Sequence, residues 1–394
     1  MSLNFDALYN RKNTNSLKWD QFKDRIRDKY NVHDSDDILP MWVADMDFAI
    51  PHVITDAIKE RLDHPIFGYS YVSDTCKQAI QQWFEKRHNW SIDPKTILFH
   101  QGVVPAIATV IETFTEPGDK ICASTPVYPA FFSIPKAQKR EVVTCDLVAN
   151  ENGYEYDFVA LEDAFKTGVK VYILCNPHNP GGVVWSQQDL EKLVQLCIKY
   201  DVLLLSDEIH ADIVFDGYKH IPTLTIKDAD KAKIVTTIAP TKSFNIAGIH
   251  AAMMVVPNET LRLKLTENLQ AHGLGEINLL ASAAVQAAYE KGEEWLDAMI
   301  QYTSNNMDYV VEELNKIDGI TVTKPNATYL IWIDYSKTGI TESEMMQRLL
   351  VKGRLAIEPG TKYEEAGRGY LRMNLACPFE TVKDGVERFK KALS

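Results

Sequence analysis

The stretch VYILCNPHNPGG (residues 171–182) begins with an unbroken apolar run and continues at once into residues that favour turns. An apolar run without polar alternation is typical of a strand whose two faces are both buried. Similar short runs, rich in β-branched residues, recur at 120–124, 140–147, 201–208, 233–239 and 251–256. Helical patterns such as 186–200 lie between several of them. This alternation predicts an α/β domain whose mostly parallel sheet is covered by helices on both sides.

The chain on either side of this region predicts two further parts. Residues 1–48 are largely polar and irregular, which indicates an N-terminal arm. After about residue 276 a long helical pattern leads into short strand-like runs and a final helix, as expected for a smaller α+β lobe. We therefore expect an arm at 1–48 that packs with the small domain, a large domain at 49–287 and a small C-terminal domain at 288–394.

The composition excludes several classes of partner. The chain has 394 residues and a formal net charge of −12, an acidic balance that argues against nucleic acid and anionic membranes. No apolar run approaches the roughly 20 residues of a membrane span. The six cysteines are scattered without a CxxC pattern, which favours buried apolar positions over disulfides or a zinc site. We expect a cytoplasmic protein that binds no metal.

Polar residues at the ends of the predicted strands are the first candidates for a site, because ligands bind at the carboxyl ends of strands in open α/β sheets. Asn176 and Asn179 follow one strand, Asp207 ends the next and Lys242 follows a third. Taken singly, the asparagines are explained equally well by a tight turn, and the aspartate by a helix cap or a salt bridge. An ordinary lysine would lie on a solvated face.

Two further features complete a pattern. Gly102 and Val103 precede a helical stretch whose N-terminus can hold a phosphate, and Tyr128 lies between prolines, where it can stack on a flat ring or simply pack. Together these residues meet the needs of pyridoxal 5′-phosphate (PLP): a lysine for its aldehyde, a carboxylate for its ring nitrogen, an amide for its ring oxygen and a helix N-terminus for its phosphate. The chain has no GxGxxG after a first strand, which argues against a nicotinamide dehydrogenase.

The motifs resemble those of fold-type I PLP enzymes of the aspartate aminotransferase superfamily, most closely the MalY/PatB group of C–S β-lyases. In order along the whole chain they are LPMWVADMDF (39–48), FGYS (67–70), NPHNPGG (176–182), SDEIHADIVF (206–215), TKSFNIAG (241–248) and YLRMNLACP (370–378). The resemblance implies a large α/β/α domain with a mixed, mostly parallel sheet, a smaller α+β domain, PLP as cofactor and a homodimer with sites at the subunit interface. It also implies cleavage of L-cystathionine or L-cysteine-type S-conjugates to a thiol, pyruvate and ammonia.

The resemblance assigns roles to individual residues. It implies three catalytic residues. Lys242 would form the Schiff base, Asp207 would pair with the ring nitrogen, and Tyr128 would stack on the cofactor ring. It also implies further cofactor contacts. The backbone N–H groups of Val103 and Val104 would bind the phosphate, and Asn179 and His210 would lie near the ring oxygen. Tyr69 would reach the phosphate of the neighbouring subunit. Arg372 would bind the substrate α-carboxylate, and the candidates for the side-chain pocket are Trp42, Tyr71 and Phe131.

Two positions depart from the pattern of many aminotransferases, which have an arginine where this chain has His250 and a serine where it has Ala239. Phosphate binding must then use other groups, such as Thr241. The departures favour the lyase, with a PLP-dependent class I/II aminotransferase as the alternative. An additional regulatory role, in which the protein binds a transcription factor or a small effector, is a further open reading. Ala247 and Gly248 are expected to let the backbone turn tightly beneath a bound ring.

Overall fold

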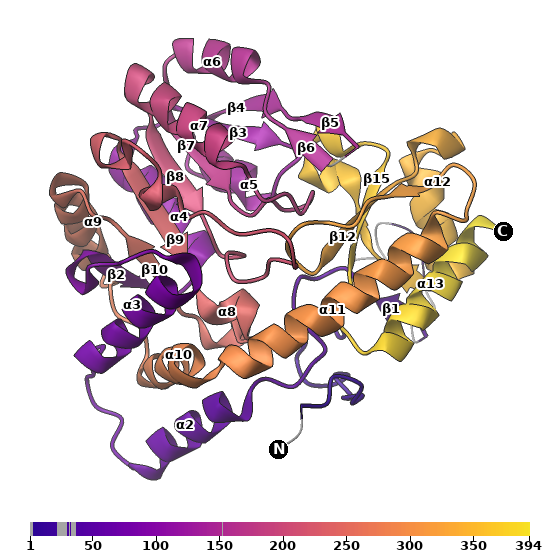
Figure 1. Cartoon of the computed structure of the whole chain (residues 1–394), viewed down its shortest axis with the longest axis horizontal. Helices are drawn as coiled ribbons and strands as arrows, with labels where there is room; N and C mark the ends of the chain where they lie inside the picture. Colours follow the sequence, from indigo (N-terminus) through magenta and orange to yellow (C-terminus); the bar gives the residue numbers. More distant parts are fainter. Residues whose placement is uncertain (1–2, 22–29, 31, 33–36, 152) are drawn as a thin grey trace.

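The computed structural model describes residues 3–21, 30, 32, 37–151 and 153–394. Figure 1 shows two sheets surrounded by helices, with the long helix α11 (Glu293–Leu314) running from α10 (Leu279–Lys291) toward the C-terminal part of the molecule. The larger sheet comes from residues 97–255 and the smaller one from residues 321–374. This is the expected combination of an α/β and an α+β part, while the domain boundaries at 48/49 and 287/288 stay predictions.

The larger sheet has the strand order β2-β10-β9-β8-β7-β3-β4. β10 is antiparallel to both of its neighbours, whereas the pairs formed among β9, β8, β7, β3 and β4 are parallel, so the mixed, mostly parallel sheet is confirmed. Its strands are Ile97–His100 (β2), Lys120–Thr125 (β3), Glu141–Asp146 (β4), Val169–Cys175 (β7), Leu203–Asp207 (β8), Ile234–Ile238 (β9) and Ala252–Val255 (β10). Because β7, β8 and β9 are parallel neighbours, the residues that follow them meet at one edge of the sheet.

Alternate residues of the central strands face different cores, which explains why their sequences are apolar throughout. Val171 and Ile173 of β7 pack in the cluster that contains α4, α5 and α9, whereas Tyr172 and Leu174 pack with α6 and α7. α2, α3 and α10 contribute to a third cluster, over β2 and β10. The helices are His52–Asp63 (α2), Asp74–His88 (α3), Val103–Phe114 (α4), Ala130–Ala137 (α5), Phe158–Lys166 (α6), Gln187–Tyr200 (α7) and Glu259–Ala271 (α9).

The smaller sheet has the antiparallel order β11-β12-β15-β14 and packs against α11, α12 and α13. The helical pattern expected over 276–317 is interrupted at Gly292, where a Cβ atom would lie 2.4 Å from a ring carbon of Phe244. The elements are Thr321–Val322 (β11), Leu330–Asp334 (β12), Glu342–Gln347 (α12), a π-helix at Arg348–Gly353, Leu355–Ala356 (β13), Glu358–Pro359 (β14), Tyr370–Asn374 (β15) and Phe379–Leu393 (α13). Val148–Asn150 (β5) and Gly153–Glu155 (β6) form a separate hairpin beside the larger sheet.

The described part of the N-terminal arm is attached to both sheets. Leu39–Pro40 (β1) pairs in parallel with β13, which lies at 355–356 in the C-terminal part of the chain. Met46 and Phe48 are hydrogen-bonded to Asn245, which lies between β9 and β10 of the larger sheet. Residues 1–2, 22–29, 31 and 33–36 of the predicted arm lie outside the described residues. Across the described ranges, no helix has the length and apolar character needed to cross a membrane.

Candidate active site

A cavity of about 290 Å³ lies at the edge of the larger sheet where β7, β8 and β9 end. It brings together seven of the residues predicted from the sequence, namely Val103, Val104, Tyr128, Asn179, Asp207, His210 and Lys242. It is also lined by residues that the sequence did not single out as site residues, namely Ala44, Cys175, Ile209 and Ala251. No group of His, Cys, Asp and Glu in the described residues is arranged to hold a metal ion.

Lys242 reaches the cavity from the short helix α8 (Pro240–Ser243), which follows β9 directly. Its Nζ donates a hydrogen bond of 2.5 Å to the carbonyl oxygen of Ala44 in the N-terminal arm. Burial lowers the pKa of Lys242 to about 8, helped by the charge of Arg372 and opposed by Asp45 and Asp207. A substantial fraction of this amine is therefore neutral near pH 8, in contrast to an ordinary surface lysine.

Asp207 is the last residue of β8 and is buried. Its Oδ1 accepts hydrogen bonds from the backbone N–H of Ile209 at 3.2 Å and from the hydroxyl of Thr237 at 3.4 Å. Burial raises the pKa of Asp207 to about 7, because these two contacts do not compensate for the loss of water. A cationic group in the cavity would favour the ionised form of this carboxylate.

Arg372 lies on β15 of the small lobe; it is not among the residues that line the cavity, but it contacts the cavity wall through Asn179. Its Nη1 donates to Oδ1 of Asn179 at 3.1 Å and its Nη2 donates to the carbonyl of Trp42 at 2.9 Å. Its guanidinium carbon lies 5.1 Å from the centre of the Tyr363 ring. Nε of this buried side chain has no hydrogen-bond partner in the structure, so one N–H group is left for a ligand.

The N-terminus of α4 opens into the cavity. Gly102 occupies the N-cap position and supplies no side-chain hydrogen bond, whereas Ser186 caps α7 in the usual way. The first N–H groups of α4, on Val103 and Val104, are therefore available to an anion, with the helix dipole adding to the attraction. Thr241 and His250 line the same cavity.

Tyr128 and His210 are two further polar side chains of the cavity wall. His210 is buried and its Nδ1 has no hydrogen-bond partner in the structure. Burial, together with the charges of Lys242 and Arg372, lowers the pKa of His210 to about 3. The imidazole is therefore neutral at physiological pH and has a ring nitrogen to offer to a ligand. Burial also raises the pKa of Tyr128, so its phenol is un-ionised.

Trp42, Tyr71 and Phe131, the candidates for the side-chain pocket, do not line the cavity in this single chain, and Tyr69 is predicted to reach the site of a neighbouring subunit. The Trp42 ring packs with Val32, Ile38, Leu350 and Ala356, and the residue reaches the site only through its carbonyl. Phe131 is buried behind the cavity wall, with its ring centre 6.0 Å from that of Tyr128, whereas Tyr69 and Tyr71 are exposed.

The turn expected at Ala247 and Gly248 is a short 3₁₀ helix, Ala247–Ile249, and Ala247 lines the cavity. Left-handed backbone conformations lie on either side of it, at Asn245 and His250, with φ of 57° and 59°. A Cβ atom placed on Gly248 would meet nothing within 4 Å, so the turn does not depend on a glycine at this position.

The contacts missed by sequence reasoning are mainly made by backbone groups. The carbonyls of Trp42 and Ala44 accept hydrogen bonds from Arg372 and Lys242. Both lie within the LPMWVADMDF motif, so the motif marked the segment, but a carbonyl contact has no signature in residue type. Cys175 and Ile209 could have been found as neighbours of Asn176 and Asp207 at the strand ends.

Comparisons with known proteins agree with this geometry. Residues 36–389 match the family described as aminotransferase class I and II. The chain is 42% identical to cystathionine β-lyase PatB of Bacillus subtilis (strain 168) over 394 residues, covering 100% of both chains. A PLP-bound protein from Clostridium difficile 630, provisionally described as an aminotransferase, superposes with a TM-score of 0.95 at 37% identity and 100% coverage of both chains. Cystalysin from Treponema denticola, which contains PLP, gives 0.94 at 31% identity, covering 100% of this chain and 99% of its own.

Proposed function

Since the chain belongs to the aminotransferase class I and II family, we propose that it is a PLP-dependent carbon–sulfur β-lyase of fold type I. It cleaves L-cystathionine or L-cysteine-type S-conjugates to a thiol, pyruvate and ammonia. The observation that carries this function is the 42% identity to a cystathionine β-lyase over the entire length of both chains. The substrate is a small amino acid, and the cofactor is PLP.

The residues of the cavity fit PLP at three places. The uncapped N-terminus of α4 suits its phosphate, and the buried carboxylate of Asp207, whose pKa burial raises despite the charge of Lys242, suits a protonated ring nitrogen. The buried amine of Lys242 suits its aldehyde. We assign the ring oxygen to Asn179 and His210 and the face of the ring to Tyr128, all of which line the cavity.

The protein residues then have the following tasks. When bound, PLP acts as an electron sink that weakens the bond between Cα of the substrate and its hydrogen. Lys242 Nζ accepts that proton as a general base, which its lowered pKa permits because the amine must be neutral. The proton is then held at Nζ, from which the departing sulfur can receive it. Asp207 holds a proton on the ring nitrogen, and the two contacts to its Oδ1 fix its orientation.

Arg372 is the proposed binding group for the α-carboxylate of the substrate. A guanidinium binds a carboxylate through two parallel N–H groups, which fixes the orientation of the amino acid as well as its charge. Asn179 and the carbonyl of Trp42 hold Nη1 and Nη2, while the unpartnered Nε remains free to donate. His210, on which the charge of Arg372 acts, is neutral and therefore adds no charge of its own at this place.

The alternative function is a PLP-dependent aminotransferase, and the description of the Clostridium difficile neighbour favours keeping it in view. The two activities share the cofactor site and differ in the fate of the substrate after Cα loses its proton. A lyase releases its products without an acceptor, whereas an aminotransferase needs a 2-oxo acid to complete each turnover.

The purified protein is expected to release pyruvate from L-cystathionine and L-cysteine at a rate that does not depend on added 2-oxoglutarate. Lactate dehydrogenase and NADH measure the pyruvate, and a thiol reagent measures the second product in equal amount. Turnover that appears only with 2-oxoglutarate, accompanied by glutamate, would assign the chain to the aminotransferases.

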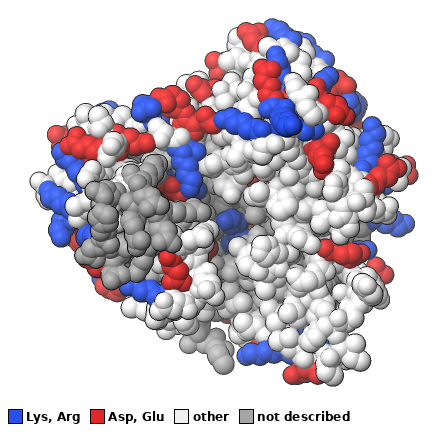
Figure 2. Space-filling model, turned by 180° about the vertical axis from the view of Figure 1, so that it is seen from behind, with Lys and Arg blue, Asp and Glu red and all other residues white. Residues whose placement is uncertain are grey.

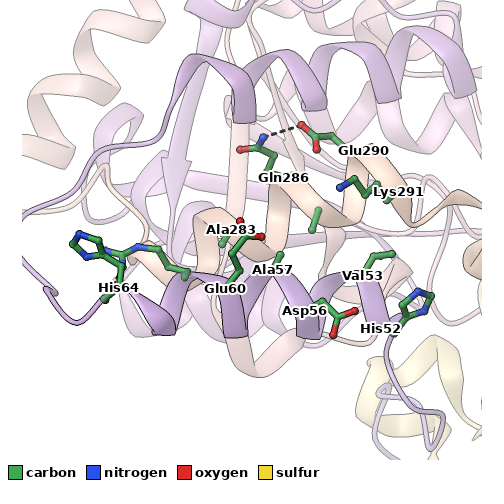
Figure 3. A pocket seen from close by; sticks show the side chains of 12 residues that line it. His52, Val53, Asp56, Ala57, Glu60, His64, Ala283, Gln286, Glu290 and Lys291 are labelled. Carbon is green, nitrogen blue, oxygen red and sulfur yellow. Dashed lines mark hydrogen bonds between the residues drawn. The ribbon is translucent and has the colours of Figure 1, made fainter.

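We also propose that the protein is a homodimer with active sites at the subunit interface, located in the cytoplasm. The segment that follows α2 exposes several large apolar side chains, namely Ile66, Phe67, Tyr69 and Tyr71. Beside it, a groove of about 740 Å³ runs between α2 and α10 and is lined by side chains of both helices, such as Asp56, Glu60 and Gln286 (Figure 3). Figure 2 shows a broad uncharged area next to a hollow with basic atoms at its base. We propose that a second copy covers the segment 66–71 and the adjoining groove, and that Tyr69 then reaches the phosphate of its neighbour.

Mixed dimers test whether the site is shared. Tyr69→Ala and Lys242→Ala subunits are each expected to be weakly active or inactive as homodimers. Their co-expressed heterodimer, isolated through two different tags, contains one site with both native residues. The heterodimer is expected to recover roughly half of the difference in lyase activity between the variant homodimers and the native enzyme. No recovery in a dimer of confirmed composition contradicts the shared site.

A further inference from the structure

One loop of the N-terminal arm contacts both cationic side chains of the site. The carbonyl of Trp42 accepts from Nη2 of Arg372 at 2.9 Å, and the carbonyl of Ala44 accepts from Nζ of Lys242 at 2.5 Å. The hydroxyl of Tyr329 donates to the same Ala44 oxygen at 3.0 Å. The loop, residues 42–48, therefore contributes to the positions of the general base and of the group that binds the carboxylate.

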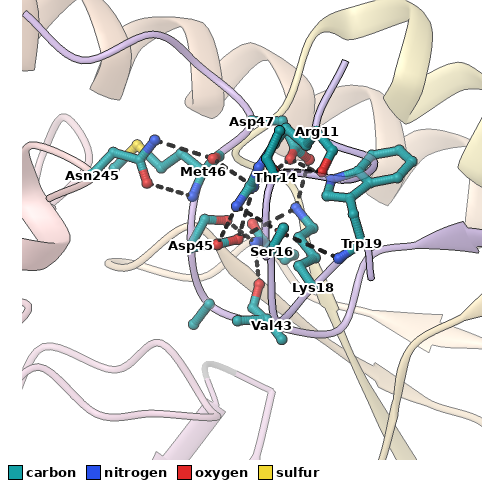
Figure 4. A network of polar contacts seen from close by, with 12 residues as sticks. Arg11, Thr14, Ser16, Lys18, Trp19, Val43, Asp45, Met46, Asp47 and Asn245 are labelled. Atoms are coloured by element: carbon teal, nitrogen blue, oxygen red, sulfur yellow. Dashed lines mark hydrogen bonds and ion pairs between the residues drawn. The ribbon is translucent and has the colours of Figure 1, made fainter. Parts of the chain in front are cut away.

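Four charged side chains hold this loop (Figure 4). Arg11 bridges both loop carboxylates, with Nη2 at 2.6 Å from Asp45 Oδ2 and Nη1 at 2.7 Å from Asp47 Oδ1. Lys18 Nζ lies 2.5 Å from Asp47 Oδ2, and the exposed fractions of these two side chains are 1% and 9%. Trp19 Nε1 also donates to Asp47 Oδ1, at 2.9 Å. We call Arg11, Lys18, Asp45 and Asp47 the arm cluster.

The burial of Lys18 and Asp47 favours one arrangement of the charges in the arm cluster. Burial by itself would raise the pKa of Asp47, yet the charge and hydrogen bond of Lys18, with Trp19 and Arg11, hold that pKa below its usual value. Removal of one member would leave an uncompensated buried charge, which costs more than the pair contributes. The loop carboxylates therefore have one favourable arrangement, in which both cations of the arm are present.

Two asparagines connect the loop to the segments that carry the site residues. Asn374, on the same strand as Arg372, donates to the carbonyls of Val43 and Asp45, both at 2.6 Å. Asn245, just after Lys242, donates to Met46 and Phe48 at 3.1 and 2.9 Å and accepts from the Met46 N–H at 2.9 Å. The loop is thus fixed from the arm, from β15 and from the segment after α8.

We propose, resting on the function above, that the arm cluster is a set of positioning residues for the active site. Arg11 and Lys18 hold Asp45 and Asp47, and these hold the loop whose carbonyls orient Lys242 and Arg372. Asp45 has a second effect, because its charge also acts on the Lys242 amine, and Arg11 compensates that charge. The arm, far from the sheet in sequence, thereby controls both the geometry and the charge of the general base.

The charge of Asp45 gives the proposal a readout that a purely structural role would not move. The charged and titratable groups that act on Lys242 or line its cavity come from several elements: Asp45 from the loop, Cys175 from β7, Asp207 and His210 from the end of β8, His250 from the segment before β10, Arg372 from β15, and Tyr128 and Tyr329. Asp45→Asn removes a negative charge and should lower the pKa of Lys242 below about 8. Arg11→Met leaves the charge of Asp45 less compensated and should raise the pKa of Lys242. Arg11→Lys keeps the positive charge, so the pKa of Lys242 should stay near its native value.

The measurement is the pH dependence of Lys242 acetylation by acetic anhydride in the cofactor-free full-length chain, followed by peptide mass spectrometry. The matched control is Arg388→Met, because Arg388 ties the arm to the small lobe through the carbonyls of Asp37 and Arg354 without touching the loop. Its midpoint should equal the native one. Opposite shifts in Asp45→Asn and Arg11→Met support the proposal. The proposal is overturned if the acetylation midpoints of Asp45→Asn and Arg11→Met shift in the same direction or do not shift. It is also overturned if Arg388→Met shifts the midpoint as much as they do.

The loaded enzyme supplies an independent second test. Folded Arg11→Met is expected to lose roughly tenfold to a hundredfold in kcat/KM through misplacement of Lys242 and Arg372, with Arg11→Lys partly restored. Native kinetics in Arg11→Met would overturn the proposal. Failure of the lyase function is distinguishable, because acetylation of Lys242 needs no substrate. If the two variants show opposite shifts but the native protein releases no pyruvate, the lyase function is refuted and the positioning role of the arm cluster is supported.

Discussion

Replacement of Lys242 by alanine is expected to lower pyruvate release from L-cystathionine by at least about 10³-fold. The variant loses the amine that binds the cofactor aldehyde and the base that removes the proton from Cα. The fold should persist, because the hydrogen bond that Lys242 loses ends on one carbonyl, that of Ala44, which keeps its contact with Tyr329. The visible absorbance of the lysine-bound cofactor should vanish as well.

Two measurements separate a chemical loss from a structural one. A small primary amine such as ethylamine should restore part of the activity of Lys242→Ala, since it can act as the base in the space left by the side chain. The exposed Lys264→Ala is the matched control and should leave turnover and absorbance unchanged. Near-native turnover of Lys242→Ala without added amine would disprove the assignment of the general base.

The same variant has a signature in the pH dependence of stability. The pKa of Lys242 is about 8 in the folded chain and 10.5 as its ordinary value, so the folded state binds fewer protons between these limits. Without cofactor, the native chain therefore gains stability as pH rises from about 8 toward 10.5, and is destabilised by this group below pH 8. Lys242→Ala should remove that part of the pH profile, as thermal unfolding of the cofactor-free protein at several pH values will show.

The sequence was most informative where residue type and chain-local pattern determine the structure. The apolar run 171–175 predicted a strand buried on both faces, and the larger sheet has it as β7. Lys242 and Asp207 were found because ligand sites collect at strand ends, and both line the cavity. These predictions needed only the period of the pattern and the general geometry of parallel sheets.

Contacts that depend on tertiary packing or on the backbone were not predictable in this way. Ala44 meets Lys242 across 198 positions of the chain through a carbonyl that any residue possesses. Trp42 was expected in the substrate pocket because it is aromatic, yet its indole N–H turns to the carbonyl of Lys18. Tyr69 stays a prediction, because its proposed partner belongs to a second copy.

Asp207→Asn is the second change with a large expected effect, a fall in kcat of about 10²- to 10⁴-fold with little change in substrate affinity. The amide has the shape of the carboxylate and can still accept from Ile209 and Thr237, so the site should remain assembled. It lacks the negative charge that holds a proton on the ring nitrogen. The expected result in steady-state kinetics is therefore a loss in kcat with a nearly native KM.

Asp207→Asn should raise the stability of the cofactor-free protein, although it lowers the activity of the loaded enzyme. The pKa of Asp207 is about 7 in the folded chain against 3.8 as its ordinary value, so the cofactor-free protein loses stability as pH rises from about 4 to 7. Asp207→Asn removes this loss and should make the cofactor-free protein more stable than the native chain at pH 8. With PLP bound, the advantage should disappear, because the native carboxylate then faces a cation.

Asp212→Asn is the control for this argument. Asp212 is also buried, and burial by itself raises its pKa. The hydrogen bond and charge of His88, with the charge of Arg87, nonetheless hold the pKa of Asp212 below its usual value. Its ionised form stabilises the fold at neutral pH, and that stability is lost as pH falls through the folded pKa. The same substitution should therefore destabilise the protein at Asp212 and stabilise the cofactor-free form at Asp207. If Asp207→Asn also destabilises the cofactor-free protein at pH 8, the carboxylate is a structural group, and its assignment to the ring nitrogen fails.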